Sequence, residues 1–394
     1  MIGDMDVDFT EPQERSDIRN AVAEITERFN DDYWLACDRD EVFPHEFYQA
    51  MADAGWLGVL APAEYGGGSL GIADVCTIME QVAYSGAAMA GCTALHPTIF
   101  AMNIIATFGQ EQLKAAVLPT MADGSSHVSF AITEPNSGSD TTRITTFARR
   151  DAGDFVVTGQ KVWISKSAMA DAMLILVRTT PREDVARPSD GLTMLYADID
   201  RDRVLTRKID KMGRAAVDSC EMFIDELRVP GDRVIGEVDR GFYALLQGLN
   251  AERIVIAAEA LGLGRRALET AVRYAKQREV FGRPIGQNQG IQFPLAESLM
   301  ELDAASLVMQ HAAWKYDQGL ECGKEANSAK YLCGAAGFNA ADRAVQTHGG
   351  FGYAKEYHVE RYFRESRVMR IAPISEAMIL NYLSHRVLGL PKSY

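Results

Sequence analysis

The spacing of apolar and polar residues divides this chain into a helical part, a β part and a second helical part. In the first third, apolar side chains recur every three or four residues, as in DIRNAVAEITERFN (17–30), which predicts amphipathic helices. Pro44 is typical of a helix start and Gly55 of a helix end. A Gly-rich loop at 62–71 precedes further helical patterns that continue to about residue 109.

The middle of the chain has a different pattern of residues. Short runs rich in β-branched and aromatic residues alternate with turn signals, which predicts strands. These runs are HVSFAIT, TTFARRDAGDFVVTG, KVWIS, AMLILVRTT, GLTMLYADID and CEMFIDELRVP. Within them, DAGD (151–154) and VTGQK (157–161) are both interpreted as hairpin connections.

From Gly241 onward the helical spacing returns in long segments such as RIVIAAEALGLGRRALETAVRYAKQR (253–278). The order of patterns predicts an α+β protein. We expect a helical region at 1–125, a β region at 126–236 and a second helical region at 237–394.

Composition narrows the class of protein. Hydrophobic residues make up 47% and charged residues 24%, an ordinary globular balance. We find no apolar stretch approaching the roughly 20 residues that a membrane helix needs, and the acidic N-terminus does not resemble a targeting signal. The net charge of −14 argues against nucleic acid and anionic membranes as partners, although a small anionic ligand remains compatible with it.

The six cysteines are scattered and contain no C-x-x-C pair, which predicts reduced thiols and a cytoplasmic protein. The seven histidines do not show metal-ligand spacing either. We therefore predict no metal site.

Four stretches carry a family resemblance. They are AITEPNSGSDTTR (131–143), KMGRAAVDSCEMFIDELRVP (211–230), REVFGRPIGQNQ (278–289) and QTHGGFGYAKEYHVERYFRE (346–365). Together, in this order and on this layout, they resemble the acyl-CoA dehydrogenase family. The resemblance implies a middle β-barrel or sandwich, a C-terminal four-helix bundle, FAD, an acyl-CoA substrate, a homotetramer built as a dimer of dimers, and an electron-transfer flavoprotein as acceptor.

The first motif supplies residues for the flavin. By the resemblance, Phe130, Ile132 and Thr133 line the flavin, and Ser139 reaches phosphate groups of cofactor and substrate. Gly138 and Ser139 would let a turn approach a ligand closely. Read alone, the same residues describe an ordinary Asn-Ser-Gly-Ser surface turn.

Trp163 and Ser165 lie two residues apart, on one face of a predicted strand. The resemblance places the aromatic ring against the flavin and the hydroxyl beside flavin N5. A core tryptophan is the alternative.

Further motifs correspond to the family's contacts with adenine and pyrophosphate, made in the family to the FAD of a neighbouring subunit. These residues are Arg278, Phe281, Gln289, Gln346, Gly349 and Gly350. Arginine offers a fork of donors to phosphate oxygens, and glycines allow backbone N–H groups to come close. We interpret His348 as a structural neighbour, and His96 as a second-rank candidate for substrate contact.

The catalytic base is missing from its usual place. Many family members carry it in a Tyr-Glu-Gly-Thr stretch, which corresponds here to Ala372, Pro373, Ile374 and Ser375. Ser375 is predicted to cap a helix, and it also stands at a cofactor-binding position. Glu376 is interpreted as a first-turn acid that faces the helix dipole. Ala372 replaces an aromatic residue, which favours branched, cyclic or aromatic acyl groups.

Some family members carry the base on another helix, and Glu252 stands at that position. Arg253 and Asn250 match residues that contact coenzyme A. Read alone, Glu252 is a solvated helix carboxylate. Pro373 also lacks the backbone N–H that polarises the thioester carbonyl in the family, and the sequence offers no replacement.

We therefore predict FAD-dependent α,β-desaturation of an acyl-CoA thioester, with Glu252 as base. The alternatives on the same fold are an enoyl-CoA reductase, a CoA-thioester desulfinase, a flavin monooxygenase, or a binding protein that has lost its chemistry.

Overall fold

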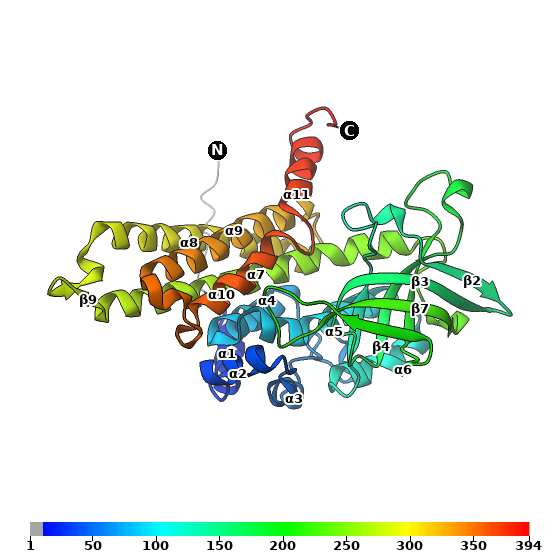
Figure 1. Cartoon of the computed structure of the whole chain (residues 1–394). Coiled ribbons are helices and arrows are strands. Elements are labelled where there is room, and N and C mark those ends of the chain that lie inside the picture. Colours follow the sequence, from blue (N-terminus) through cyan, green and yellow to red (C-terminus); the bar gives the residue numbers. More distant parts are fainter. Residues whose placement is uncertain (1–10, 394) are drawn as a thin grey trace.

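The computed structural model describes residues 11–393, which form a helical N-terminal part, a β sheet and a helical C-terminal part (Figure 1). The N-terminal helices are α1 (Gln13–Thr26), α2 (Asp31–Asp40), α3 (His45–Asp53), α4 (Ile72–Val82), α5 (Ala88–Phe108) and α6 (Glu111–Ala122). Pro44 and Gly55 flank α3, as predicted. The carboxylate of Asp317, from the C-terminal part, accepts hydrogen bonds from the N–H groups of Ile72 and Ala73 and so fixes the start of α4.

Two of these helices correct the prediction about apolar stretches. α4 and α5 are joined by a π-helical turn, Ala83–Ala87, and the combined stretch Ile72–Phe108 is long and apolar enough to cross a membrane. However, 94% of its most apolar window is buried inside the protein. Such burial is what a core helix shows, so length and composition alone do not indicate a membrane span here.

The middle part is one sheet that folds around an apolar core. Its strands are β1 (Val128–Ala131), β2 (Phe147–Asp151), β3 (Asp154–Ser165), β4 (Ala172–Arg178), β5 (Leu192–Asp198), β6 (Val204–Lys208), β7 (Ser219–Val229) and β8 (Val234–Ile235). The strand order is β6-β7-β3-β2-β4-β5-β8, with β1 parallel to β4. β4 is buried at every position because Ile175 faces the core of the sheet while Leu176 packs against α5 and α6.

One predicted hairpin is wrong. DAGD does connect β2 to β3, but VTGQK lies inside β3, which continues without a turn. Gly159 forms a bulge there with φ +157°, and an added Cβ would lie 2.5 Å from Thr146 Oγ1. The glycine is needed for this close approach of β3 to Thr146, the residue before β2.

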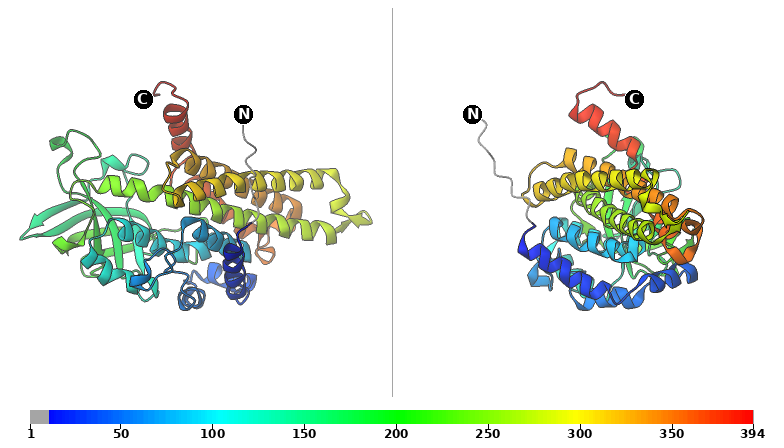
Figure 2. Two further views of the ribbon diagram at one scale, coloured as in Figure 1. Left: turned by 180° about the vertical axis from the view of Figure 1, so that it is seen from behind. Right: turned by 90° about the vertical axis from the view of Figure 1, so that its left-hand side faces the viewer.

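The C-terminal part is a bundle. It contains α7 (Gly241–Gln277), α8 (Gln289–Asp317), α9 (Gly323–His348), α10 (Val359–Ser366) and α11 (Glu376–Tyr382). A Cβ on Gly264 of α7 would lie 2.8 Å from Gly337 Cα of α9, so small residues bring these two helices together. A hairpin of β9 (Glu279–Val280) and β10 (Arg283–Pro284) connects α7 to α8 at the end of the molecule opposite the sheet, while α11 projects from the bundle (Figure 2). The predicted α+β class and its order of parts are confirmed.

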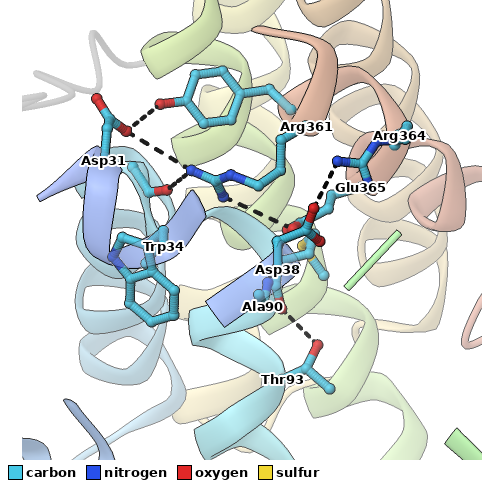
Figure 3. Close-up of polar contacts among 12 residues, drawn as sticks. Asp31, Trp34, Asp38, Ala90, Thr93, Arg361, Arg364 and Glu365 are labelled. Atoms are coloured by element: carbon cyan, nitrogen blue, oxygen red, sulfur yellow. Dashed lines mark hydrogen bonds and ion pairs between the residues drawn. The ribbon is translucent and has the colours of Figure 1, made fainter. Parts of the chain in front are cut away.

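A buried charged cluster ties α10 to the N-terminal helices (Figure 3). Arg364 donates to Asp38 at 2.8 Å, and Glu365 accepts the backbone N–H of Ala90 at 2.9 Å. Burial raises the pKa of Glu365 above its ordinary value, although Arg361 opposes that shift. The cluster therefore works as a junction between the first and last helical parts.

Candidate active site

Glu252 lies in the first half of α7, where its neighbours Ala251 and Arg253 are buried and its own side chain is only partly exposed. Loss of hydration raises the pKa of Glu252 to about 7, while Arg253 lowers it and Glu259 raises it further. A carboxyl group with this pKa can take up and release a proton near neutral pH.

Arg253 stands beside this carboxyl group with few partners of its own. Its guanidinium donates to Asn250 Oδ1 at 2.8 Å, and this is its one hydrogen bond within residues 11–393. Its Nε is shielded from solvent and has no hydrogen-bond partner among the described residues. Burial lowers the pKa of Arg253 from its ordinary value. A largely buried guanidinium with spare donors suits an anionic ligand such as a phosphate.

The carboxylate at the start of α11, Glu376, is not available to take up a proton near neutral pH. Glu376 makes a two-point ion pair with Arg370 at 2.6 and 2.9 Å, which lowers the pKa of the Glu376 carboxyl. Ser375 Oγ accepts from the N–H of Met378 and caps α11, as predicted. The structure thus keeps Glu376 ionised and paired with Arg370 at the start of α11.

The 130–134 segment is clamped from β3. Thr133 Oγ1 donates to Val162 O at 2.6 Å, and the Val162 N–H donates to Thr133 O at 2.9 Å. Lys161 Nζ donates to Ile132 O and to Glu134 Oε1, each at 3.0 Å. Phe130 and Ile132 pack partly against the apolar cluster shared with α5 and α6. Sequence reasoning missed Lys161, because nothing in the spacing of its neighbours indicates a buried lysine.

Next to this clamp, several predicted residues face open space. Trp163 is 57% exposed and has a left-handed φ of +64°, at a register shift between β3 and β7. Ser165 is partly exposed. Gly138 and Ser139 are exposed, and a Cβ on Gly138 would meet nothing within 4 Å. An exposed aromatic ring suits a planar cofactor, and an exposed Gly-Ser turn suits a phosphate tail.

The remaining predicted residues gather at the far end of the bundle. Arg278 ends α7 and lies over the ring of Phe351 at 5.6 Å, next to Gly349 and Gly350. Phe281 is fully exposed at the tip of the β9–β10 hairpin. Gln289 begins α8, and Gln346 is exposed on the last turn of α9. The structure therefore brings Arg278 together with the glycine motif, but it holds both about 39 Å from Glu252 along α7, at about 1.5 Å per residue.

The two singled-out histidines are both buried. His348 Nδ1 lies 2.8 Å from Ala344 O, and its ring stacks on Tyr274. His96 Nδ1 lies 2.8 Å from Glu259 Oε1. Sequence reasoning did not single out Glu259, although it follows Glu252 by two helical turns and so shares its face of α7.

Comparison with known proteins gives one consistent result. Models of the acyl-CoA dehydrogenase N-terminal, middle and C-terminal domains match residues 12–125, 129–227 and 239–388. Acyl-CoA dehydrogenase FadE12 of Mycobacterium tuberculosis is 39% identical, over 99% of this chain and all of that protein. The 3-(aryl)acrylate reductase of Clostridium sporogenes is 33% identical, over 92% of this chain and 95% of the relative. The solved butyryl-CoA dehydrogenase of Megasphaera elsdenii has a TM-score of 0.91 at 26% identity, covering 97% of this chain and 100% of that one.

Proposed function

Because this chain belongs to the acyl-CoA dehydrogenase family of FAD-dependent oxidoreductases, we propose that it desaturates an acyl-CoA thioester with Glu252 as the base. The observation that carries the assignment is the position of Glu252 on α7 between the buried residues Ala251 and Arg253, where loss of hydration raises the pKa of its carboxyl group to about 7. Pro373 stands where many members carry the base, and Glu376 is held by Arg370. Glu252 is therefore the carboxylate best suited to take a proton.

Each residue has a distinct task in this reaction. Glu252 removes the proton from the α-carbon of the thioester. Bound FAD supplies the acceptor for the hydrogen that leaves the β-carbon. Arg253 and Asn250 bind the phosphates of coenzyme A, while Phe130, Ile132, Thr133, Trp163 and Ser165 orient the flavin ring.

We further propose that each site is shared between chains of a homotetramer. Glu252 and Arg278 are about 39 Å apart along α7, which favours their serving two different FAD molecules. The full exposure of Phe281 supports a partner there. A soluble electron-transfer flavoprotein in the cytoplasm is the proposed electron acceptor.

An anaerobic titration tests the reaction class. The protein with bound FAD is mixed with a panel of straight, branched and aryl acyl-CoA thioesters, and flavin absorbance is followed. We expect bleaching by at least one thioester and turnover with a dye acceptor. A protein that stays oxidised under nitrogen but, when supplied with a reductant and oxygen, inserts one oxygen atom into the substrate would be a monooxygenase instead.

A second candidate is the reverse reaction, reduction of an enoyl thioester. The relative named 3-(aryl)acrylate reductase and the small Ala372 side chain favour it. In that case chemically reduced enzyme would be reoxidised by an aryl enoyl-CoA much faster than the aryl propionyl-CoA bleaches the oxidised enzyme.

The raised pKa of Glu252 predicts a pH profile. The base must be ionised, so the rate constant of flavin reduction should fall about tenfold per pH unit as the pH drops below about 7, and it should level off above that value. Stopped-flow reduction at thioester concentrations well below saturation, between about pH 5.5 and pH 8.5, measures this, because the second-order rate constant reports ionisation of the free enzyme. A rate that stays constant through that range would contradict the assignment.

A further inference from the structure

A buried carboxylate–histidine pair lies beside the proposed active site and has no task in the desaturation. His96 of α5 and Glu259 of α7 face each other, with Nδ1 and Oε1 2.8 Å apart. The exposed fractions of the two side chains are 10% and 0%. Burial of such a pair is costly, and titratable groups that are buried together mark candidate functional sites.

The pair lies on the side of α7 that carries Glu252. Gly248, Glu252 and Glu259 follow one another at intervals of four and seven residues, so they share one face of the helix. A Cβ on Gly248 would lie 2.7 Å from Ile104 Cγ1, so this face packs on α5. It meets α5 again where Glu259 contacts His96. The two helices therefore run antiparallel, and Glu252 faces α5 between these contacts, about 10 Å before Glu259 along the axis.

The imidazole of His96 has one nitrogen left for a ligand. Its Nε2 has no hydrogen-bond partner within residues 11–393 and, unlike Oε2 of Glu259, is not shielded from solvent. An ionised carboxylate only accepts hydrogen bonds, so Nδ1 carries the proton that points to Glu259, and Nε2 of the neutral ring is an acceptor. The ring of Phe100 stacks on His96, with centroids 5.0 Å apart, and supports this orientation.

A guanidinium group stands beside this imidazole. Arg214, in the loop between β6 and β7, donates to Thr93 Oγ1 at 3.2 Å, and Thr93 lies one helical turn before His96 on α5. This is the one hydrogen bond of the Arg214 side chain within residues 11–393, which leaves further N–H donors free. Burial lowers the pKa of Arg214, while the charges of Glu365 and Glu259 oppose that shift. An acceptor and a donor are therefore neighbours on one face of α5.

A hydroxyl group suits both neighbours, since it donates one hydrogen bond and accepts others. A carboxylate would meet a second acceptor at Nε2, and a hydrocarbon would leave both polar groups unpaired. We propose that His96, held by Glu259, binds a hydroxyl group on the far part of the acyl chain, so that this protein takes hydroxyl-bearing acyl-CoA thioesters. The hydroxyl contact rests on the proposed function, because Glu252 fixes where the α-carbon lies.

Binding of enoyl products to the oxidised, FAD-loaded protein tests this contact without turnover. The ligands are cinnamoyl-CoA with its meta-hydroxy and para-hydroxy analogues, and hexenoyl-CoA with its ω-hydroxy analogue. Isothermal titration calorimetry measures each Kd. We expect at least one hydroxyl analogue to bind about 3- to 10-fold more tightly than its own parent. A preference below about threefold for every analogue would overturn the proposal, as would tighter binding of para-carboxycinnamoyl-CoA than of any hydroxyl analogue.

His96→Asn removes the ligand-facing nitrogen and keeps the contact to Glu259, because the asparagine amide ends at the level of Nδ1. This variant should bind the preferred hydroxyl analogue and its parent within about twofold of each other. His96→Gln should restore part of the preference, because its amide reaches the level of Nε2. His311→Asn is the matched control, since His311 is exposed on α8, and it should keep the full preference. A preference that survives in His96→Asn would overturn the role of His96.

Glu259 is tested as a positioning residue. Glutamine can donate to Nδ1 as well as accept from it, so Glu259→Gln no longer fixes the proton on Nδ1. We expect the preference for the hydroxyl analogue to fall about threefold, while the Kd of the parent stays within about twofold of wild type. A structural role alone would weaken both ligands equally or neither, and either result would contradict the role of Glu259.

Failure of the hydroxyl contact and failure of the proposed function are distinguishable. If no acyl-CoA bleaches the wild-type flavin, the desaturation assignment fails, yet calorimetry on the oxidised protein still decides the contact. Bleaching together with no preference for a hydroxyl analogue overturns only the contact. FAD content and thermal unfolding of each variant show whether it is folded. If His96→Asn does not fold, the wild-type preference and its change in Glu259→Gln decide.

Discussion

Replacement of Glu252 by glutamine is expected to slow reduction of the bound flavin by an acyl-CoA by roughly 10³- to 10⁴-fold, the upper range for loss of a positioned base. The amide has nearly the same shape as the carboxyl group but cannot accept the α-proton. FAD content and affinity for coenzyme A should stay close to wild type, because Arg253 and Asn250 still form their hydrogen bond. Anaerobic stopped-flow absorbance measures the rate, and equilibrium titration measures the affinity.

Glu376→Gln is the matched control for this experiment. Glu376 is the carboxylate nearest in sequence to the family's usual base position, and its ion pair with Arg370 fixes the start of α11. We expect this variant to keep flavin reduction within a few-fold of wild type and to lose a little stability. A Glu252→Gln protein that reduces flavin fully while Glu376→Gln does not would move the base to residue 376.

Replacement of Lys161 by methionine is expected to destabilise the β part by about 3–5 kcal/mol, the cost of leaving a buried charge without its partner. The Lys161 and Glu134 side chains are 0% and 4% exposed. Burial would raise the pKa of Glu134, but Lys161 and the donors of Thr145 and Thr146 hold it below the ordinary value. Methionine fills the space of lysine but supplies none of its three hydrogen bonds.

Denaturant unfolding followed by FAD fluorescence measures this loss. Without the hydrogen bonds of Lys161 to Ile132 and Glu134, the flavin should be released at a lower denaturant concentration than in the wild type. Lys208→Met is the control, since Lys208 pairs with Glu41 at an exposed position and should cost at most about 1 kcal/mol. The double variant Glu134→Gln with Lys161→Met should recover part of the loss, because no buried charge is left alone. If the denaturant midpoint of Lys161→Met equals that of Lys208→Met, the buried pair of Lys161 and Glu134 does not contribute to the free energy of unfolding.

Periodicity was enough to predict the order of helical and β parts, because burial of one face leaves a repeating pattern in the sequence. It failed where the structure depends on a distant neighbour. The turn predicted at VTGQK is instead a bulge, where Gly159 passes close to Thr146, the residue before β2. The prediction of no long apolar stretch was wrong at α4 and α5, since α5 alone spans 21 residues without a charged side chain.

The site, too, could be predicted where it depends on neighbours in sequence and not where it depends on distant residues. Glu252, Arg253 and Asn250 are close in sequence, so a single motif contains them. Lys161 and Lys330 act on carbonyl oxygens of Ile132 and Ile374, and a lysine in the sequence does not indicate which carbonyl it will reach. The raised pKa of Glu252 likewise depends on packing around α7 that no local pattern records.

The length of α7 has a consequence for inheritance. Under the shared-site proposal, one copy of the chain gives its Glu252 to one flavin and its Arg278 to another, because the helix holds them about 39 Å apart. Loss of either residue then damages different sites of the assembly. In a cell that makes both kinds of defective chain, mixed assemblies contain some sites in which both residues are intact, so two inactive alleles can restore activity to each other.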